Sequence, residues 1–399
     1  MDKLTLRDLD IDGKKVLMRV DFNTPLDERG EVADDTRIRA SLPSIRYILE
    51  QGGRLILMSH LGRPKGVEPS LSLAPCARVL SRLLNHSVEL APDCIGPQVT
   101  QIAEKLARGD ILLLENLRFH PAEEDPTLDP SFAQKLASLA DLYVNDAFAA
   151  AHRAHSSTAT IAEYFPGKAA AGLLLQKEIE VLTALLLHPK RPFYAIIGGA
   201  KISTKIGVLN ALSDKINALF IGGGMAYPFL EAQGIAIGDS LCPKEAPLLA
   251  RQFLQRCEEK KLPLYLPQDL LIASSLEPKA HTKIIPVSQG IPPGWQGVDI
   301  GPLTLQEWNK HLTKAATLFW NGPVGIYENP AFARGTQSLA LTLASLSATT
   351  VVGGGDSVAA IQHLHLEKRF THLSTGGGAC LEWIEFGHLP GIEALSKKA

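Results

Sequence analysis

Arginine and histidine side chains follow several apolar stretches in the first half of the chain. Each stretch is typical of a buried strand, and the carboxyl ends of parallel strands meet at one edge of a sheet, where ligands bind. Arginine can hold a phosphate or carboxylate through two parallel hydrogen bonds. We therefore expect a pocket for an anion, although each arginine taken alone would also fit a solvated surface. The candidates are Arg37, Arg63, Arg118, Arg153, His60, His152 and His155.

Three glycine triplets end apolar stretches in the second half, at residues 222–224, 353–355 and 376–378. Glycine lets a backbone approach a ligand closely, and the N–H groups at the start of a following helix favour negative charge. This pattern suits the phosphates of a nucleotide, while tight turns are the alternative. None of the triplets completes GxGxxG or GxxxxGK[ST], so the sequence lacks the dinucleotide fingerprint and the Walker loop.

Two lysines and an aspartate accompany these glycines. Lys201 and Lys205 stand four residues apart in GGAKISTK, so on a helix both ammonium groups could reach one polyanion. An ordinary solvated helix face is the alternative. Asp356 follows the glycines of VVGGGDSVAAI, where it could hold Mg²⁺ beside phosphates or cap a helix.

These features together indicate phosphoryl transfer, a reaction in which positioning and charge neutralisation supply most of the catalysis. No aspartate stands out as a general base for an alcohol acceptor. A carboxylate acceptor needs no base, because with a pKa of about 4 it is already ionised at neutral pH. The arginine-rich half could therefore hold an acid that is itself phosphorylated.

Net charge and cysteine pattern indicate which partners and which cellular location to expect. The 399 residues carry 40 basic and 42 acidic side chains, a net charge of −2, without a polybasic block. We expect no nucleic-acid or membrane partner. The five cysteines form no CxxC, and the first residues lack the apolar core of a signal peptide. We expect a cytoplasmic protein without structural zinc.

Short apolar runs alternate with amphipathic stretches, which is typical of parallel sheets covered by helices. This α/β rhythm predicts two doubly wound, Rossmann-like parallel-sheet domains facing a cleft, with a boundary near residues 165–190 and a connecting helix over 177–192. A further helix is expected over 37–53. The expected strands lie within 16–23, 54–62, 110–117, 142–148, 193–200, 218–224, 263–270, 317–325, 349–356 and 371–378.

A series of motifs resembles the phosphoglycerate kinase family, in the order that this family has them. They are RVDFNTPLD, DDTRIRASLP, SHLGRPKG, ENLRFHPAEE, VNDAFAAAHRAHSS, GGAKISTKI, GGGMAYPFL, DIGP, WNGPVGIYE, GGGDSVAAI and STGGGACLE. The resemblance implies a glycolytic kinase that transfers a phosphoryl group reversibly between 1,3-bisphosphoglycerate and ADP, giving 3-phosphoglycerate and ATP with Mg²⁺. It also implies a monomer.

The resemblance assigns domains and residues. Residues 1–170 would bind phosphoglycerate, residues 171–384 would bind the nucleotide, and segment 385–399 would pack back on the first domain. The phosphoglycerate residues would be Asp21, Asn23, Arg37, His60, Leu61, Gly62, Arg63, Arg118 and Arg153. The nucleotide residues would be Gly199, Ala200, Lys205, Gly223, Gly224, Gly297, Asn321, Pro323, Glu328, Gly354, Gly355, Asp356 and Ser357, with Asp356 on the metal. Arg37, Lys201, Gly377 and Gly378 would act on the transferred group.

Two other classes of protein remain open at the level of sequence. A Rossmann-type dehydrogenase could use the same α/β layout, although its fingerprint is missing. A non-catalytic nucleotide-binding protein of the same fold would bind ATP without turnover. Such a protein can lose its transferring residues, whereas Arg37, Lys201, Lys205 and Asp356 are all present here.

Overall fold

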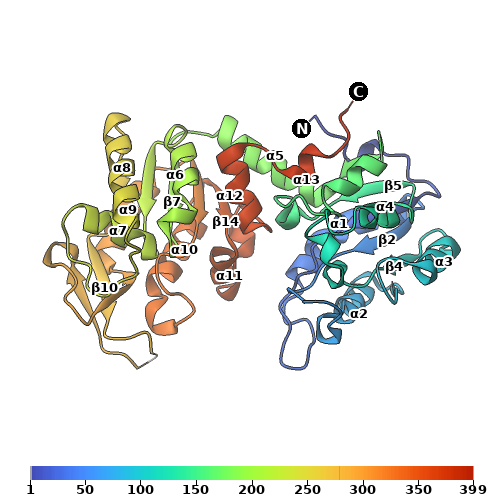
Figure 1. Ribbon diagram of the computed structural model, residues 1–399. Coiled ribbons are helices and arrows are strands. Elements are labelled where there is room, and N and C mark those ends of the chain that lie inside the picture. Colours follow the sequence, from blue (N-terminus) through green and yellow to red (C-terminus); the bar gives the residue numbers. More distant parts are fainter. Residues whose placement is uncertain (1, 278, 399) are drawn as a thin grey trace. The chain divides into compact units, whose positions relative to one another are not determined.

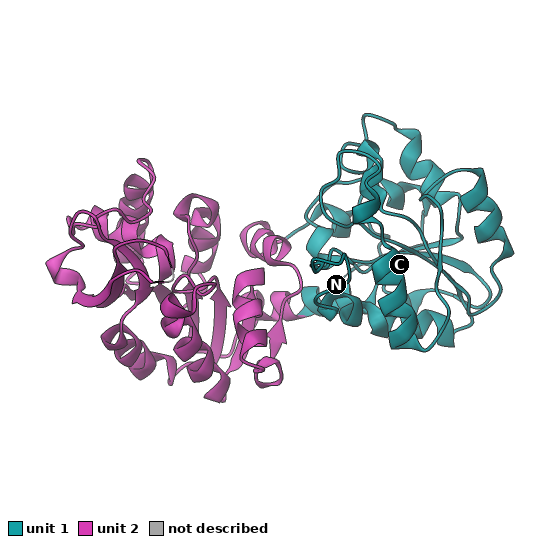
Figure 2. Ribbon diagram, turned by 90° about the horizontal axis from the view of Figure 1, so that it is seen from below, with its two compact units in different colours: residues 1–180, 388–399 teal, residues 181–387 magenta. Residues whose placement is uncertain are grey.

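The computed structural model describes residues 2–277 and 279–398, which divide into two compact units. Unit 1 comprises the described residues up to Glu180 together with those from His388 onward, and unit 2 comprises Val181–Gly387 (Figure 2). Each unit is built on its own six-stranded sheet with interleaved helices (Figure 1). The predicted fold class, α/β with two parallel sheets, is confirmed.

The sheet of unit 1 is parallel throughout and has the strand order β3-β4-β2-β1-β5-β6. The interiors of its longer strands are apolar and buried, because helices cover both faces of a parallel sheet. The strands are β1 (Lys15–Arg19), β2 (Arg54–Met58), β3 (Glu89–Leu90), β4 (Ile111–Leu113), β5 (Leu142–Asn145) and β6 (Ala169–Ala171). The helices of this unit are α1 (Thr36–Glu50), α2 (Ala74–Leu84), α3 (Pro97–Lys105), α4 (Ser131–Ala137) and α13 (Pro390–Glu393).

Strand β1 is the point at which the strand order of unit 1 reverses. It pairs with β2 on one side and with β5 on the other, so the chain builds the sheet outward in both directions from β1. Loops that leave the carboxyl ends of two such neighbouring strands diverge and leave a crevice for a ligand. The predicted anion residues follow β1, β2, β4 and β5, and therefore belong to this edge.

The C-terminal segment of the chain lies against β6, an edge strand of the sheet in unit 1. The Ser396 N–H donates to the carbonyl of Ala169 on β6 at 3.0 Å, and the Leu4 N–H donates to the carbonyl of Ser396 at 2.8 Å. Leu389, Ile392 and Leu395 are buried. The two ends of the polypeptide thus join the same unit.

Unit 2 repeats this architecture with the strand order β15-β14-β13-β7-β8-β9, again parallel. Its reversal point lies between β7 and β13. The strands are β7 (Phe193–Ile197), β8 (Ala218–Ile221), β9 (Leu264–Tyr265), β13 (Thr317–Asn321), β14 (Thr349–Gly353) and β15 (His372–Leu373). The helices are α6 (Ile206–Ser213), α7 (Ala226–Ala232), α8 (Ala246–Glu259), α9 (Pro302–Leu312), α10 (Arg334–Ser345), α11 (Gly355–His363) and α12 (Gly377–Phe386).

Unit 2 also contains an antiparallel sheet that the sequence did not predict. Its order is β11-β10-β12, from β10 (Asp269–Ala273), β11 (Thr282–Pro286) and β12 (Gln296–Ile300). Residues 263–270, expected to form one strand, instead contain β9 and the start of β10. The expected connecting helix exists as α5 (Leu173–Leu187), which begins before residue 177 and spans the boundary between the units.

None of the helices in the described part of the chain combines the length and apolar character that a membrane crossing requires.

Candidate active site

In unit 1 the loops after β1 and β2 are tied together by polar side chains. The Gly62 N–H donates to Asn23 Oδ1 at 2.8 Å, and the Phe22 N–H donates to Ser59 Oγ at 2.8 Å. Arg37 Nη1, from helix α1, donates to Asp21 Oδ2. These bonds bring Asp21, Asn23, Arg37 and Gly62, all predicted for the anion pocket, into one connected group.

The other three arginines predicted for the anion pocket differ in their contacts within unit 1. Arg118, in the 3-10 helix η3 (Leu117–Phe119), donates to the carbonyl of Gly62 at 2.8 Å and pairs with Glu124 at 2.8 Å. Its Nε atom is buried without an acceptor among the described residues. Arg63 and Arg153 are exposed, and their guanidinium groups make no hydrogen bond or ion pair with any residue that the structure describes. Two cationic groups are therefore available to an anion from solution.

A buried charge network, which the sequence did not predict as functional, lies beneath His60. Arg19 is 1% exposed and its Nη2 lies 3.0 Å from His60 Nδ1, while its Nε donates to Ser157 Oγ at 2.8 Å. Glu123, also buried, accepts from Ser157 Oγ at 2.6 Å and lies 3.8 Å from Arg19. Burial raises the pKa of Glu123, and Arg19 and Ser157 oppose that rise.

This network fixes the protonation of His60. A guanidinium group can only donate hydrogen bonds, so His60 Nδ1 must accept and the ring proton must sit on Nε2. Burial, followed by the charge of Arg19, lowers the pKa of His60 well below its ordinary value of 6.5. His60 is therefore a neutral imidazole that offers one N–H donor. The signal in the sequence was Arg19 itself, a charged residue within the apolar run VLMRV.

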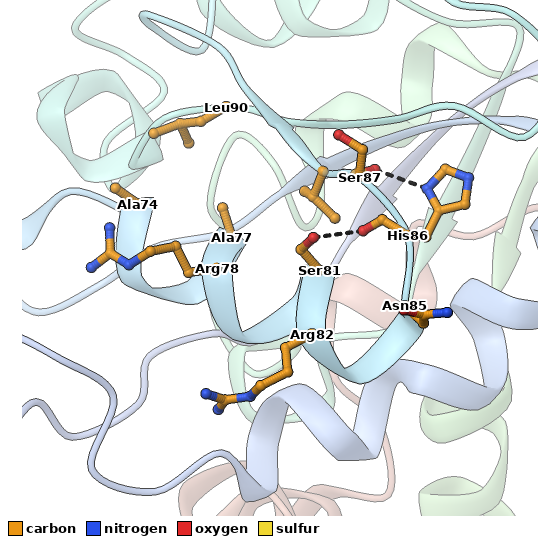
Figure 3. A pocket seen from close by; sticks show the side chains of 10 residues that line it. Ala74, Ala77, Arg78, Ser81, Arg82, Asn85, His86, Ser87 and Leu90 are labelled. Atoms are coloured by element: carbon orange, nitrogen blue, oxygen red, sulfur yellow. Dashed lines mark hydrogen bonds between the residues drawn. The ribbon is translucent and has the colours of Figure 1, made fainter.

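A separate groove of about 740 Å³ lies along α2 in unit 1 (Figure 3) and contains none of the predicted site residues. Three of its polar side chains already have partners within the described chain. Ser81 Oγ donates to the carbonyl of His86 at 2.7 Å, His86 Nδ1 contacts the carbonyl of Ser87 at 2.9 Å, and Arg78 pairs with Glu31 at 2.7 Å. We therefore assign this groove to neither substrate.

In unit 2, two adjoining pockets lie at the carboxyl ends of the strands, with volumes of about 490 and 270 Å³. Gly199, Ala200, Pro323 and Asp356 line both. The larger pocket also includes Gly223, Gly224, Gly297 and Glu328, and the smaller one Lys205, Asn321, Gly354, Gly355, Ser357, Gly377 and Gly378. Of the residues predicted for this unit, Lys201 alone lines neither pocket. Tyr227 lines the larger pocket and was not predicted.

The glycine triplets are needed because backbone lies against backbone in both pockets. A Cβ atom on Gly377 would lie 3.0 Å from Gly354 Cα, and one on Gly223 would lie 2.8 Å from the carbonyl oxygen of Pro323. Gly354 and Gly223 also have positive φ angles, which favour glycine. As a result, the N-termini of α11 and α12 start close together, and their free N–H groups favour negative charge.

Asn321 supplies the most direct sign that this pocket is built to bind a ligand. Its Nδ2 atom is buried and has no acceptor among the residues that the structure describes. A buried, unpaired donor carries the full cost of its desolvation, so such groups require an explanation. Its other amide atom, Oδ1, accepts from Lys205 Nζ at 2.6 Å. The amide orientation that this bond fixes leaves Nδ2 for an acceptor supplied by a ligand.

The predicted helix over Lys201 and Lys205 is wrong. Lys201 has extended backbone and precedes the 3-10 helix η7 (Ile202–Thr204), and α6 begins only after Lys205. The two ammonium groups therefore differ. Lys201 is exposed, whereas Lys205 Nζ donates to the carbonyl of Gly198 at 2.8 Å and to Asn321. Burial lowers the pKa of Lys205 to about 8, against a smaller opposing effect of Asp356.

Asp356 does not cap α11, so the capping role considered for it is wrong. The cap position belongs to Gly354, and Asp356 is the second residue of the helix with its side chain exposed. Ser357, next to it, is buried and accepts from the Gly322 N–H at 2.7 Å, so its hydroxyl oxygen stabilises the loop after β13.

One unit has cationic side chains at the edge of its parallel sheet, and the other has glycine-rich helix N-termini there. Together these features define the class of protein as a phosphotransferase of the two-domain α/β type. The chain belongs to the phosphoglycerate kinase family, whose family model matches residues 6–386. It is an enzyme that transfers a phosphoryl group to a carboxyl acceptor, so the dehydrogenase alternative is wrong.

Known relatives cover the whole chain. It is 52% identical over 399 residues to the phosphoglycerate kinase of Moorella thermoacetica, with both chains fully covered. It is 48% identical to the chloroplastic phosphoglycerate kinase 1 of Arabidopsis thaliana, covering 83% of that protein. The structure of phosphoglycerate kinase from Coxiella burnetii matches with a TM-score of 0.86 and 39% identity, over 98% of each chain.

The Arg19 contact leads to a prediction for His60. The ring should stay neutral as the pH falls through 6.5, with its proton on Nε2, because Arg19 can only donate to Nδ1. Imidazole ¹⁵N chemical shifts measure both properties. In Arg19→Met the pKa should move back toward the ordinary value and both neutral tautomers should appear. A wild-type ring that becomes charged near pH 6.5 would contradict this assignment.

The burial of Lys205 leads to a second prediction, on pH. In the free protein this lysine loses its proton as the pH rises through about 8. A bound phosphate favours the charged form, so ADP binding near pH 8.5 should take up a proton and ADP affinity should fall from pH 7.5 to 9. Titration calorimetry in buffers of different ionisation enthalpy measures the uptake. Lys205→Met should bind more weakly and take up less; equal uptake would exclude Lys205 as the group.

Proposed function

We propose that unit 2 binds the nucleotide and unit 1 binds the phosphoglycerate, so that the phosphoryl group of 1,3-bisphosphoglycerate passes reversibly to ADP. The observation that carries this proposal is the unpaired Nδ2 of Asn321 beside the converging N-termini of α11 and α12. A polyphosphate supplies both the acceptor that this amide lacks and the negative charge that the two helix starts favour.

In unit 2 the two pockets would divide the nucleotide between them. The larger pocket, with an apolar lining that includes Val298, Ile326 and Tyr227, suits the adenine and ribose. The smaller one suits the phosphates, because Lys205, Asn321 and the glycines of α11 and α12 surround it. Asp356 lines both pockets and so would stand where the nucleoside meets the phosphates.

Asp356 would hold Mg²⁺. Its carboxylate is exposed at the start of α11 and makes no ion pair with a residue in the described ranges, which suits a cation that keeps several waters and needs only one or two protein carboxylates. When bound, Mg²⁺ supplies neutralisation of charge on the nucleotide phosphates. The helix starts and Lys205 supply the remaining positive potential.

In unit 1 the acid would lie among the groups at the carboxyl ends of the strands. Arg63, Arg118 and Arg153 would bind the phosphate of phosphoglycerate, the first and last of them through guanidinium groups that have no partner within the described chain. His60 would donate its Nε2–H as a neutral group, with Asn23, Asp21 and the Leu61–Gly62 backbone completing the site. The acceptor carboxylate is ionised at neutral pH, so no general base is needed.

Lys201 and Arg37 would act on the phosphoryl group during transfer, together with the N–H groups of Gly377 and Gly378 at the start of α12. Lys201 is exposed and makes no side-chain ion pair with a described residue, so its ammonium is free to stabilise charge that develops in the transition state. We further propose that the protein acts in glycolysis as a cytoplasmic monomer with no nucleic-acid or membrane partner.

These roles predict that Lys201 and Arg63 affect different kinetic constants. Lys201→Ala should lower kcat about 100-fold or more while leaving the Kd for ADP nearly unchanged, because its charge would act mainly in the transition state. The measurement is a coupled assay of ADP formation from ATP and 3-phosphoglycerate, with nucleotide binding measured separately. Unchanged kcat would remove Lys201 from the mechanism.

Arg63→Ala provides the matched comparison in unit 1. Losing one charged hydrogen bond to the phosphate should raise the KM for 3-phosphoglycerate about 10-fold or more, with a smaller change in kcat. The KM for ATP should stay the same. If the KM for the acid is unaffected, Arg63 does not contact the substrate.

A further inference from the structure

Unit 1 contains a cluster of metal-ligating side chains that shares no residue with the predicted anion site. Asp93 and Cys94 lie in the loop that follows β3, and His120 lies between η3 and the 3-10 helix η4 (Pro121–Glu123). One ligand atom from each residue, a carboxylate oxygen, the Sγ and an imidazole nitrogen, lies within 4.8 Å of the other two. Within the described ranges no other group of three or more such side chains converges in this way.

The cluster is held in place by its own contacts. Asp93 Oδ1 accepts from the Cys94 N–H at 2.6 Å and lies 2.7 Å from His120 Nε2. The imidazole stacks on Phe132 with a centroid distance of 5.3 Å. Cys94 is fully buried, whereas Asp93 and His120 are partly exposed, so a small ion could enter past the carboxylate and the imidazole.

The ligand types separate this cluster from a magnesium site. Thiolate, imidazole and carboxylate together are the ligands of zinc-like ions, whereas Mg²⁺ prefers oxygen ligands alone. Bond lengths of about 2.0–2.3 Å place two tetrahedral ligands of zinc roughly 3.5 Å apart. The three ligand atoms, all within 4.8 Å of one another, would move closer together on binding. Three protein ligands would leave one position open for water.

We propose that Asp93, Cys94 and His120 form a binding site for a divalent transition-metal ion of the zinc type. On binding, the Cys94 thiol releases its proton to solvent and binds as thiolate, the Asp93 carboxylate binds through one oxygen, and neutral His120 binds through one ring nitrogen. The hydrogen bond between His120 and Asp93 is replaced by two bonds to the metal. This site lies in unit 1, while the proposed Mg²⁺ ligand Asp356 lies in unit 2.

Cobalt(II) tests the proposal, because a thiolate ligand gives it a charge-transfer band in the near ultraviolet that oxygen ligands do not. The full-length protein, treated with a chelator and free of nucleotide, should develop this band with saturation at one equivalent of Co²⁺. Added Zn²⁺ should remove it. Cys94→Ser should abolish the band, and His120→Gln and Asp93→Asn should each weaken Co²⁺ binding about 10-fold or more.

Controls distinguish loss of a ligand from loss of the fold. Cys257→Ser replaces another buried cysteine, in unit 2, and should leave the band unchanged. Near-ultraviolet circular dichroism should show that each variant is folded, and His120→Gln retains the thiol should Cys94→Ser be unstable. No thiolate band in the wild type with excess Co²⁺, or an equal band in Cys94→Ser or in both His120→Gln and Asp93→Asn, would overturn the proposal.

Discussion

The close approach of two glycine turns is the constraint on which unit 2 depends. Gly377 lies so near Gly354 that a Cβ atom on Gly377 would press on backbone, which cannot move aside as a flexible side chain can. This contact brings the starts of α11 and α12 together at the edge of one parallel sheet. Their unsatisfied N–H groups, the buried Asn321 amide and the partly desolvated Lys205 then share one small pocket. The proposed phosphate site would therefore depend largely on backbone N–H groups.

In unit 1 the predicted anion site is formed by side chains. Buried charged groups beneath His60 hold that site in place. Burying Arg19 and Glu123 is costly unless every charged group is paired and hydrogen-bonded. Ser157 and His60 complete those bonds. The same network prevents His60 from adding a further positive charge beside the arginines, because Arg19 occupies its second nitrogen. The proposed anion site would thereby keep the fixed positive charges of its arginines without a titrating imidazolium beside them.

Much of the fold could be predicted from apolar runs, because strands buried on both faces leave a continuous signal. Each of the ten expected segments overlaps a strand. The antiparallel sheet was missed because β11 is largely exposed and lacks such a run. The sequence placed Lys201 and Lys205 on one helix, but spacing could not reveal that Lys205 bonds to Gly198 and Asn321. Likewise, Arg19–His60 and Asp93–His120 are neighbours only in the folded chain, and Cys94 carries no CxxC spacing.

The most direct test of the account is an amide chemical-shift titration of the assigned protein with Mg²⁺ and ADP, followed by 3-phosphoglycerate. The account predicts that ADP shifts the amides of Gly354, Gly355 and Gly377 and the side-chain amide of Asn321, and that 3-phosphoglycerate shifts Asn23, Gly62 and Arg63. A response to ADP centred on Gly62 and Arg63, with the glycines of α11 and α12 unmoved, would contradict the assignment of the nucleotide to unit 2.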